Sequence, residues 1–328
     1  MNAASLAGSM AAELPVVVVA DPIDRAALEA LRAGPCQVID ASGEPNRLAD
    51  HLRSAWGLIV RSRTKVTGEL IARAPRLALI ARAGVGLDNV DVPAAKARRI
   101  QVVNVPQAAT TSVAELTVAL YLLLVRDLLP PIASTKAGRW ERGLHGHELH
   151  GRTVGFVGYG RIAREVVRHL GPFGVRTLAF DPFVPAASDG TELVELDRLL
   201  AESDIVSVHA ALTDQSRHLI DARALGKMRP GAFLVNVARG ALVDEAAVVD
   251  ALRSGRLAGA ALDVFETEPP TRHELLSDPR VVATPHLGAS TEEAQRRAGA
   301  DVVAEVLHVL RGGPIAAAGG PDAGVGAP

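Results

Sequence analysis

The stretch TVGFVGYGRIAREVV (residues 153–167) decides the fold of this chain. It has the pattern of a buried strand, a glycine turn and the first turns of an amphipathic helix. Gly158, Gly160 and Ala163 fill the three positions of G-x-G-x-x-G/A. The first glycine permits a tight turn, and the second lets backbone N–H groups approach a pyrophosphate at the helix N-terminus. The third position lies where the helix packs on the strand, and one methyl group is tolerated there.

The residues after this turn indicate which dinucleotide it binds. A second strand follows about twenty residues later and ends at Asp181, which is placed to bind ribose hydroxyls. No Lys or Arg lies between Asp181 and Arg198, so this stretch offers nothing to neutralise a 2′-phosphate. We therefore predict NAD, not NADP, as the cofactor. The alternative, a turn without a ligand, is disfavoured by the strand before the motif and the helix after it.

Composition narrows the class of protein. A chain of 328 residues is too long for most single cores, so we expect two domains. The net charge of -2 gives no reason to expect a nucleic-acid partner. The one cysteine, Cys36, excludes an intramolecular disulfide. We find no membrane-spanning run and no basic residue in the first fifteen positions that would mark a secretory signal, so we expect a cytoplasmic protein without a membrane partner.

Short β-branched runs alternate with helical patterns along nearly the whole chain, which is typical of parallel sheets covered on both faces. Eleven such runs are more than one sheet usually holds, so we assign five to a first sheet and six to a second. A helix expected at 111–127 separates them. It is apolar nearly all round, which predicts burial between layers or at a subunit contact.

The predicted architecture is α/β, with two Rossmann-like, doubly wound parallel-sheet domains, one flavodoxin-like and one NAD-binding. The NAD-binding domain, at 107–289, is inserted into the other, which takes 14–106 and 290–312 because the last long helix returns to it. The end of the chain, 313–328, is rich in Gly, Ala and Pro, and we predict that it is disordered.

Five motifs in order along the chain resemble the D-isomer-specific 2-hydroxyacid dehydrogenase family, and most of all its D-3-phosphoglycerate dehydrogenase branch. The motifs are RAGVGLDNVD, GRTVGFVGYGRIAREV, NVARGALVDEAAVVDAL, GAALDVFETEPP and TPHLGASTEEAQ. The similarity covers roughly residues 14–312. It implies two Rossmann-like domains, with the NAD-binding domain inserted into the substrate-binding domain, which is the layout that periodicity predicts.

The resemblance implies a catalytic trio of Arg239 in NVARG, Glu268 in DVFETEP and His286 in PHLGAS. His286 would remove the hydroxyl proton as hydride leaves carbon 2, and return it in the reverse reaction. Glu268 would hold the other ring nitrogen and favour imidazolium. Arg239 would bind the substrate carboxylate bidentately and polarise the carbonyl. Glu266, two residues before Glu268, competes for the same role.

The resemblance also implies binding residues. For NAD these are Gly158, Gly160, Arg161, Ile162, Asp181, Ala210, Val237, Ala238, Arg239, Asp263, His286, Gly288 and Ala289. Among them, Asp263 would accept a hydrogen bond from the carboxamide, and Ala210 stands where the family often has Thr, so only a backbone contact survives there. For the substrate they are Arg61, Arg82, Ala83, Gly84, Val85 and Arg239.

The implied activity is oxidation of a D-2-hydroxy acid to the 2-oxo acid and its reverse. Arg61 and Arg82 match arginines of the phosphoglycerate branch, which favours 3-phosphoglycerate as substrate and a place in serine biosynthesis. A glyoxylate or hydroxypyruvate reductase, or a broader 2-hydroxyacid dehydrogenase, is the alternative. A second alternative is an NAD-sensing, non-catalytic scaffold of the corepressor type. The family implies a homodimer or a higher homo-oligomer.

A cluster of histidines needs a separate explanation. His145, His147 and His150 lie close together in HGHELH, before the strand that starts the glycine motif. Their spacing is not that of H-E-x-x-H, because the second histidine arrives one residue early. We predict no metal site.

Overall fold

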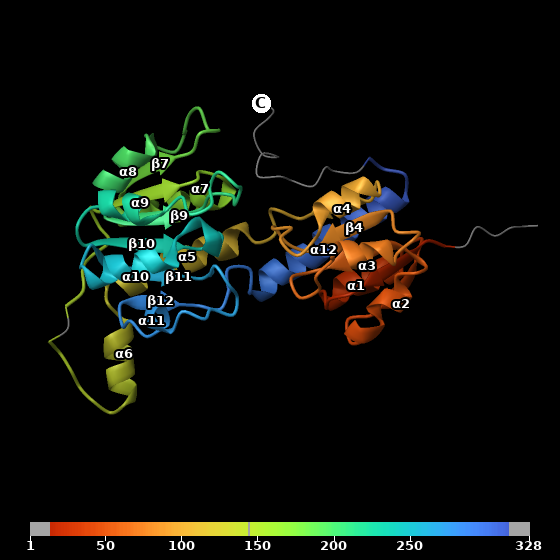
Figure 1. Cartoon of the computed structure of the whole chain (residues 1–328), viewed down its shortest axis with the longest axis horizontal. Coiled ribbons are helices and arrows are strands. Elements are labelled where there is room, and N and C mark those ends of the chain that lie inside the picture. Colours follow the sequence, from red (N-terminus) through yellow and green to blue (C-terminus); the bar gives the residue numbers. More distant parts are fainter. Residues whose placement is uncertain (1–13, 144, 315–328) are drawn as a thin grey trace, which may run out of the picture. The chain divides into compact units, whose positions relative to one another are not determined.

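The computed structural model describes residues 14–143 and 145–314 (Figure 1). Most of the segment predicted to be disordered therefore lies outside the described residues. The chain divides into two compact units: one runs up to Ala108 and resumes at Gln295, and the other is Ala109–Ala294. The sequence places these crossings after 106 and after 289. The second crossing lies instead within the first turn of the last helix, where Ala294 still belongs to the inserted unit.

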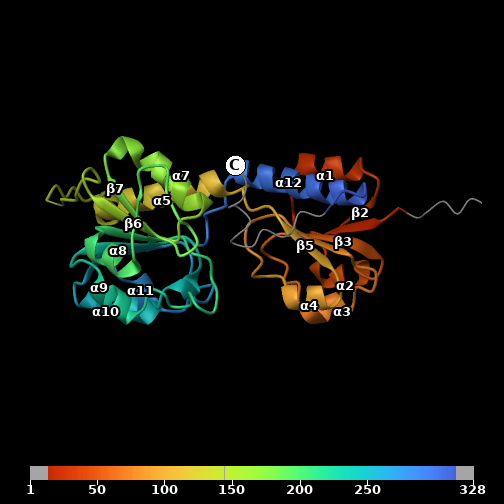
Figure 2. The ribbon, with the colours of Figure 1, turned by 90° about the horizontal axis from the view of Figure 1, so that it is seen from above.

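The first unit is built on a five-stranded parallel sheet in the order β2-β1-β3-β4-β5. Its strands are β1 (Val16–Val19), β2 (Gln37–Asp40), β3 (Ala55–Val60), β4 (Leu79–Arg82) and β5 (Gln101–Asn104). Its helices are α1 (Arg25–Arg32), α2 (Leu48–His51), α3 (Gly68–Ala72), α4 (Val92–Ala97) and most of α12 (Glu292–Leu310). Figure 2 shows α1 and α12 on one face and α2, α3 and α4 on the other.

Strand periodicity explains why both faces of this sheet are covered. Val17 and Val19 pack into the core formed with α1 and α12, whereas Val18 belongs to the core on the opposite face. Successive side chains of a strand point to opposite faces, so the continuous valine run of β1 needs a core on each face of the sheet.

The inserted unit holds a seven-stranded parallel sheet in the order β12-β11-β10-β9-β6-β7-β8. Its strands are β6 (Thr153–Val157), β7 (Arg176–Phe180), β8 (Glu192–Leu193), β9 (Ile205–Val208), β10 (Ala232–Asn236), β11 (Leu257–Leu262) and β12 (Val281–Ala283). The sequence analysis predicted six strands for this sheet, which was wrong, because it missed β8. Its two residues form only an edge pairing with β7, and so short an element has no readable alternation.

Helices cover both faces of this second sheet. They are α5 (Thr110–Val125), α7 (Arg161–Leu170), α8 (Leu196–Glu202), α9 (Ala222–Lys227), α10 (Glu245–Arg253) and α11 (His273–Leu276). Figure 2 shows α5 and α7 on one face and the other four on the opposite face. A further helix, α6 (Leu129–Lys136), lies apart from the sheet in Figure 1.

The apolar helix predicted at 111–127 is α5, and it packs within its own unit against α7 and strands β10, β11 and β12. Its side chains from Ser112 to Val125 are largely buried there. In the described part of the chain, no single helix is long and apolar enough to cross a membrane. Together α5 and α6 meet that length and composition, but the chain bends by 78° between them.

A buried aspartate shapes the turn after β3 in the first unit. Asp21 is 1% exposed, and its carboxylate accepts hydrogen bonds from the Arg61 N–H (2.7 Å) and from the Thr64 N–H and hydroxyl (3.2 and 2.6 Å). Arg63 Nε lies 3.3 Å from the same carboxylate. Burial by itself raises the pKa of Asp21, but the hydrogen bonds from Thr64 and Arg61 and the charge of Arg63 outweigh it and lower that pKa.

We expect Asp21→Ala to lower the free energy of unfolding by about 2–4 kcal/mol, because several buried donors lose their acceptor at once. The lowered pKa means that the Asp21 carboxylate stabilises the fold above the ordinary aspartate pKa and that this stabilisation is lost as pH falls through the folded-state value. The difference between wild type and Asp21→Asn in urea denaturation should therefore shrink from pH 7 towards about pH 3.

The control is Asp50→Ala in the same unit. Asp50 is exposed and its carboxylate lies 3.6 Å from Arg53, so its loss should change stability by less than about 0.5 kcal/mol. Equal effects of the Asp21 and Asp50 substitutions would contradict the assigned role of Asp21.

Candidate active site

Three neighbouring strands of the inserted unit carry the predicted catalytic residues on the loops at their carboxyl ends. Arg239 follows β10, Glu268 follows β11 and His286 follows β12, and these strands are consecutive in the sheet. Parallel strands bring their carboxyl ends to one edge, which is where α/β domains bind ligands. Residues up to 47 positions apart in the chain therefore come to one edge of the sheet.

Glu268 and His286 are in direct contact. His286 Nδ1 lies 2.9 Å from Glu268 Oε2 and 3.2 Å from Oε1, and both side chains are about half exposed. The backbone of His286 has a positive φ of 54°, which is uncommon for a residue with a side chain. Its N–H donates to the carbonyl oxygens of Asp263 (2.9 Å) and Thr284 (3.0 Å), which hold it there. Such a backbone conformation costs about 1–3 kcal/mol and recurs at functional sites.

Asp263 is the residue that fixes the His286 loop. It is 1% exposed, and its carboxylate accepts from the Thr284 hydroxyl (2.7 Å), the Leu287 N–H (2.7 Å) and the Gly288 N–H (2.9 Å). A carboxylate offers about four acceptor positions, so three are already used within the protein. The resemblance assigns Asp263 to the cofactor carboxamide, and at most about one position is left for it.

The turn that carries Arg239 is shaped by Asn236, which the sequence analysis did not single out. Asn236 is buried, its Nδ2 donates to the Arg239 carbonyl (2.9 Å) and its Oδ1 accepts from the Ala238 N–H (3.1 Å). The half-buried Arg239 side chain donates from Nη1 to the Ala238 carbonyl (2.7 Å). A polar residue at the end of an otherwise apolar strand was the available signal. Val237 and Ala238 lie in the same turn.

The structure separates the two competing glutamates. Glu266 Oε1 accepts from the Glu245 N–H at 3.0 Å and lies 3.6 Å from His218 Nε2. Glu268 instead reaches His286. Two residues of spacing on this irregular loop are enough to point the carboxylates at different partners.

The glycine turn approaches Ala210 at the end of β9. Gly158 has φ +92°, and a Cβ on it would lie 2.5 Å from Ala210 N, so only glycine fits. Gly160 stands before the first residue of α7, and nothing lies within 4 Å of where its Cβ would be. Among the described side chains, none caps the N-terminus of α7 by a hydrogen bond. A helix N-terminus with open space before it suits a pyrophosphate, and Arg161 and Ile162 form its first turn.

Asp181 lies directly after β7, as predicted, and also supports the glycine turn. Its Oδ2 accepts from the Tyr159 N–H (2.8 Å) and its Oδ1 from the Phe183 N–H (2.9 Å). The Tyr159 ring is buried beneath the turn, where its hydroxyl bonds to Asp189 and Thr191, and the Arg164 guanidinium lies 5.3 Å from the ring centre. These features together fit a dinucleotide such as NAD.

A second histidine on this edge is excluded as an acid–base group. His209, just before Ala210, has Nε2 2.8 Å from Ser207 Oγ and its ring 5.6 Å from that of Phe156. Burial lowers the pKa of His209 to about 3, so this imidazole is uncharged at neutral pH. Its proton affinity is too low for a base that works near pH 7.

The predicted substrate residues lie at the carboxyl edge of the first sheet. Arg61 directly follows β3, and Arg82 ends β4 opposite Val60. Ala83, Gly84 and Val85 form the next turn, where the Arg82 side chain packs over Gly84 and Asn104 Nδ2 donates to the Val85 carbonyl at 2.5 Å. Arg63, which is nearby in sequence, is instead engaged by Asp21 and the Ser42 carbonyl (2.6 Å).

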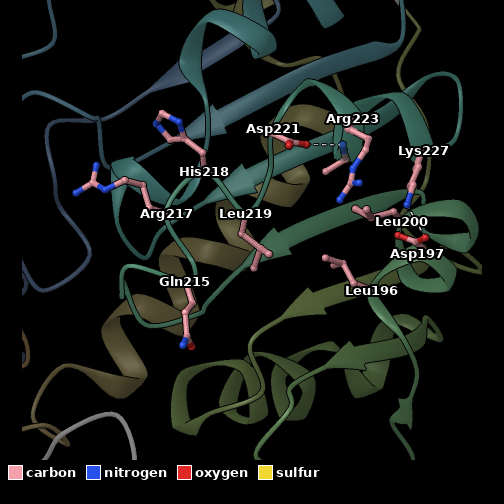
Figure 3. Close-up of a pocket in the computed structure, with 11 residues that line it drawn as sticks. Leu196, Asp197, Leu200, Gln215, Arg217, His218, Leu219, Asp221, Arg223 and Lys227 are labelled. Atoms are coloured by element: carbon pink, nitrogen blue, oxygen red, sulfur yellow. Dashed lines mark hydrogen bonds and ion pairs between the residues drawn. The ribbon is translucent and has the colours of Figure 1, made fainter.

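Two further features of the described residues bear on metal and ligand binding. Among the described residues, no three His, Cys, Asp or Glu side chains are grouped to hold a metal ion. A cavity of about 210 Å³ opens between α8 and α9 (Figure 3). In its lining, Lys227 pairs with Asp197 at 2.5 Å, and the Asp221 carboxylate accepts from the Ala224 N–H at 2.8 Å. Its lining comes from residues to which the sequence assigned no role.

Comparison with known proteins identifies the family. The model of the D-isomer specific 2-hydroxyacid dehydrogenase, NAD binding domain, matches residues 118–288. Hydroxypyruvate reductase of Thermotoga maritima is 43% identical over 299 residues, which cover 90% of this chain and 98% of that protein. The chain belongs to the D-isomer-specific 2-hydroxyacid dehydrogenase family. The predicted family, its α/β fold and its NAD-binding domain are thereby confirmed.

Other members of the family differ in the named substrate. D-3-phosphoglycerate dehydrogenase of Mycobacterium leprae is 46% identical over 318 residues, which cover 95% of this chain but 60% of that protein. A solved glyoxylate reductase from Paecilomyes thermophila superimposes with a TM-score of 0.83 at 30% identity, covering 93% of this chain and 98% of that one. This dehydrogenase therefore spans about three fifths of the phosphoglycerate dehydrogenase and nearly all of the two reductases.

We expect Asp181→Asn to raise the dissociation constant of NADH and lower that of NADPH, changing their ratio by about tenfold or more, because a carboxylate repels a 2′-phosphate. Asparagine keeps one oxygen for the Tyr159 N–H, so the glycine turn is largely preserved and only the charge is lost. Asp181→Ala would remove the charge and this hydrogen bond together. Fluorescence titration with both cofactors measures this. Asp250→Asn, an exposed change on α10, is the control, and an unchanged ratio in Asp181→Asn would mean that the ribose is recognised elsewhere.

Proposed function

We propose that this dehydrogenase catalyses the NAD-dependent oxidation of a D-2-hydroxy acid to the 2-oxo acid, and the reverse reaction. The observation that carries the proposal is the contact of the Glu268 carboxylate with His286 Nδ1, at 2.9 Å. Bound NAD would supply the hydride acceptor for carbon 2. Everything else that the reaction needs is proton transfer, charge neutralisation and orientation by side chains of the protein.

His286 is the proposed general base. Because Glu268 holds Nδ1, Nε2 is the nitrogen left to take the proton of the substrate hydroxyl. The adjacent carboxylate stabilises the imidazolium that forms, as in a Ser-His-Asp triad. In the reverse direction the same imidazolium returns the proton to the carbonyl oxygen.

Arg239 is the proposed carboxylate anchor. Its guanidinium offers two parallel N–H donors to a carboxylate, and it leaves a further donor for the oxygen on carbon 2. The Asn236 hydrogen bonds fix the backbone of the turn that carries Arg239, so the position from which its guanidinium extends is defined. Lysine, a single point charge, would not keep both contacts.

We propose 3-phosphoglycerate as the substrate, which places the reaction in serine biosynthesis in the cytoplasm. Support comes from Arg61 and Arg82, two cations on neighbouring strand ends of the first unit, and from the 46% identity to a phosphoglycerate dehydrogenase. The alternative, hydroxypyruvate or glyoxylate reduction, is supported by the Thermotoga maritima reductase, which this chain matches over 98% of its length.

Two further proposals concern the oligomeric state of the protein and a role without catalysis. Exposed apolar side chains on and after α6 support a homodimer: Ile132 is 45% exposed and Trp140 is 79% exposed. A non-catalytic, NAD-sensing scaffold is the less favoured alternative, because the RAGVGLDNVD motif resembles the phosphoglycerate branch of the family, whose members are metabolic enzymes. Tight NADH binding without turnover of any 2-oxo acid would favour it.

We expect His286→Ala to lower kcat by about a hundredfold or more and to leave the NADH dissociation constant nearly unchanged, because a general acid–base contributes on that scale. Arg239→Lys should lower kcat/KM mainly through substrate binding. Steady-state kinetics and NADH fluorescence measure these effects. His145→Ala, an exposed histidine, is the control, and near wild-type turnover of His286→Ala would overturn the assignment.

Substrate choice is tested with phosphohydroxypyruvate, hydroxypyruvate, glyoxylate and 2-oxoglutarate at saturating NADH. We expect phosphohydroxypyruvate to lead in kcat/KM by about tenfold or more, equivalent to about 1.4 kcal/mol. Arg61→Ala and Arg82→Ala should each reduce that lead, whereas Arg73→Ala, an exposed arginine at the end of α3, should not. If the unphosphorylated acids match phosphohydroxypyruvate, the reductase alternative holds.

A further inference from the structure

Two glutamates outside the proposed catalytic trio bind each other's backbone. The Glu266 N–H donates to Glu245 Oε1 at 2.6 Å, and the Glu245 N–H donates to Glu266 Oε1 at 3.0 Å. Glu245 is 5% exposed, so its carboxylate is removed from water. A buried carboxylate is costly unless it is hydrogen-bonded, which the reciprocal pair provides.

The surroundings of the pair explain how two acidic groups are tolerated side by side. Burial and the Glu266 charge raise the pKa of Glu245, and they outweigh the Glu266 N–H and the Arg272 charge, which lower it. Two basic groups face the pair from other segments. Arg272 Nε lies 3.5 Å from Glu245 Oε2, and His218 Nε2 lies 3.6 Å from Glu266 Oε1.

The pair joins the two loops that carry Arg239 and Glu268. Glu245 is the first residue of α10, directly after the loop that starts at β10. Glu266 lies in the loop after β11, two residues before Glu268. A second contact reinforces the junction, because a Cβ on Gly240 would overlap the backbone of Phe265 and Glu266. Gly240 directly follows Arg239, so the loops touch next to both proposed catalytic groups.

Helix capping does not account for Glu245. The N-cap of α10 is Asp244, whose carboxylate already accepts from the N–H groups of Ala246 (2.9 Å) and Ala247 (3.1 Å). The Glu245 side chain points away from this task and accepts a bond from the neighbouring loop instead. Its acceptor therefore acts between loops and not within its own helix.

We propose that Glu245 and Glu266 form a clasp that positions the Glu268 loop against His286 and sets its place relative to Arg239. The proposal rests on the proposed function, because it assigns a purpose to the same three loops. Both are positioning residues: they contact backbone groups of the loops, and the reacting atoms are left to Arg239, Glu268 and His286. The bond to the Glu266 N–H requires only an oxygen acceptor on residue 245, so the negative charge of Glu245 is dispensable for that bond.

The test uses three substitutions of Glu245 in the full chain. Glu245→Ala removes the acceptor and should lower kcat about tenfold or more, since small misplacement of reacting groups is costly, while the NADH dissociation constant stays within about twofold. Glu245→Met removes the acceptor but keeps the volume, so it should show the same loss if the alanine variant does not fold. Glu245→Gln keeps an oxygen acceptor and should restore most of the turnover. Glu274→Ala, an exposed carboxylate on α11, is the control.

Two results would overturn the clasp. One is wild-type kcat in a folded Glu245→Ala or Glu245→Met protein, even with a lowered melting temperature, because that pattern marks a structural role alone. The other is an equal loss of kcat in Glu245→Gln and Glu245→Met. His286→Ala separates the two proposals: if it is inactive while Glu245→Met is not, only the clasp fails, and if it remains active, the proposed function fails first.

Discussion

The proposed active site depends on the hydrogen bonds that the buried carboxylate of Asp263 accepts. This carboxylate stands at the end of β11 and accepts hydrogen bonds from the Thr284 hydroxyl and from two N–H groups of the loop after β12. These bonds fix the loop in which His286 has a positive φ and lies next to Glu268. The strain at His286 is small compared with three hydrogen bonds to a buried charge, each contributing about 1.5–3 kcal/mol.

A similar arrangement recurs at three other strand ends that carry a proposed role. Asn236 shapes the turn of Arg239 after β10, and Asp181 supports the glycine turn after β7. In the first unit, Asp21 holds the turn of Arg61 after β3. In each case a polar side chain at the carboxyl end of a strand satisfies backbone N–H groups of a loop. Loops placed in this way present exposed functional side chains from a rigid support.

Much of this molecule was readable from local pattern. The strand, glycine turn and helix of residues 153–167 became β6, the turn at Gly158 and α7, because close backbone approach and strand burial are local requirements. The apolar helix was placed within two residues of α5. The two-residue β8 and the return point of the chain inside α12 were missed, since each depends on an edge pairing or on packing between distant segments. The roles of the proposed catalytic, cofactor-binding and substrate-binding residues stay predictions.

The sequence by itself determined the α/β class, the insertion of one domain into the other and the NAD-binding unit, because strand periodicity, helix periodicity and glycine spacing are properties of short segments. The family was predicted from the resemblance of five sequence motifs to it. Only the tertiary structure decided which glutamate contacts His286 and that Glu266 binds the backbone of Glu245 instead. It also decided that the Asp263 carboxylate accepts most of its hydrogen bonds from the His286 loop. These pairings join loops that follow different strands. Their partners are chosen by the order β10-β11-β12 in the sheet and by the geometry of each turn, neither of which is encoded in the spacing of residues along the chain.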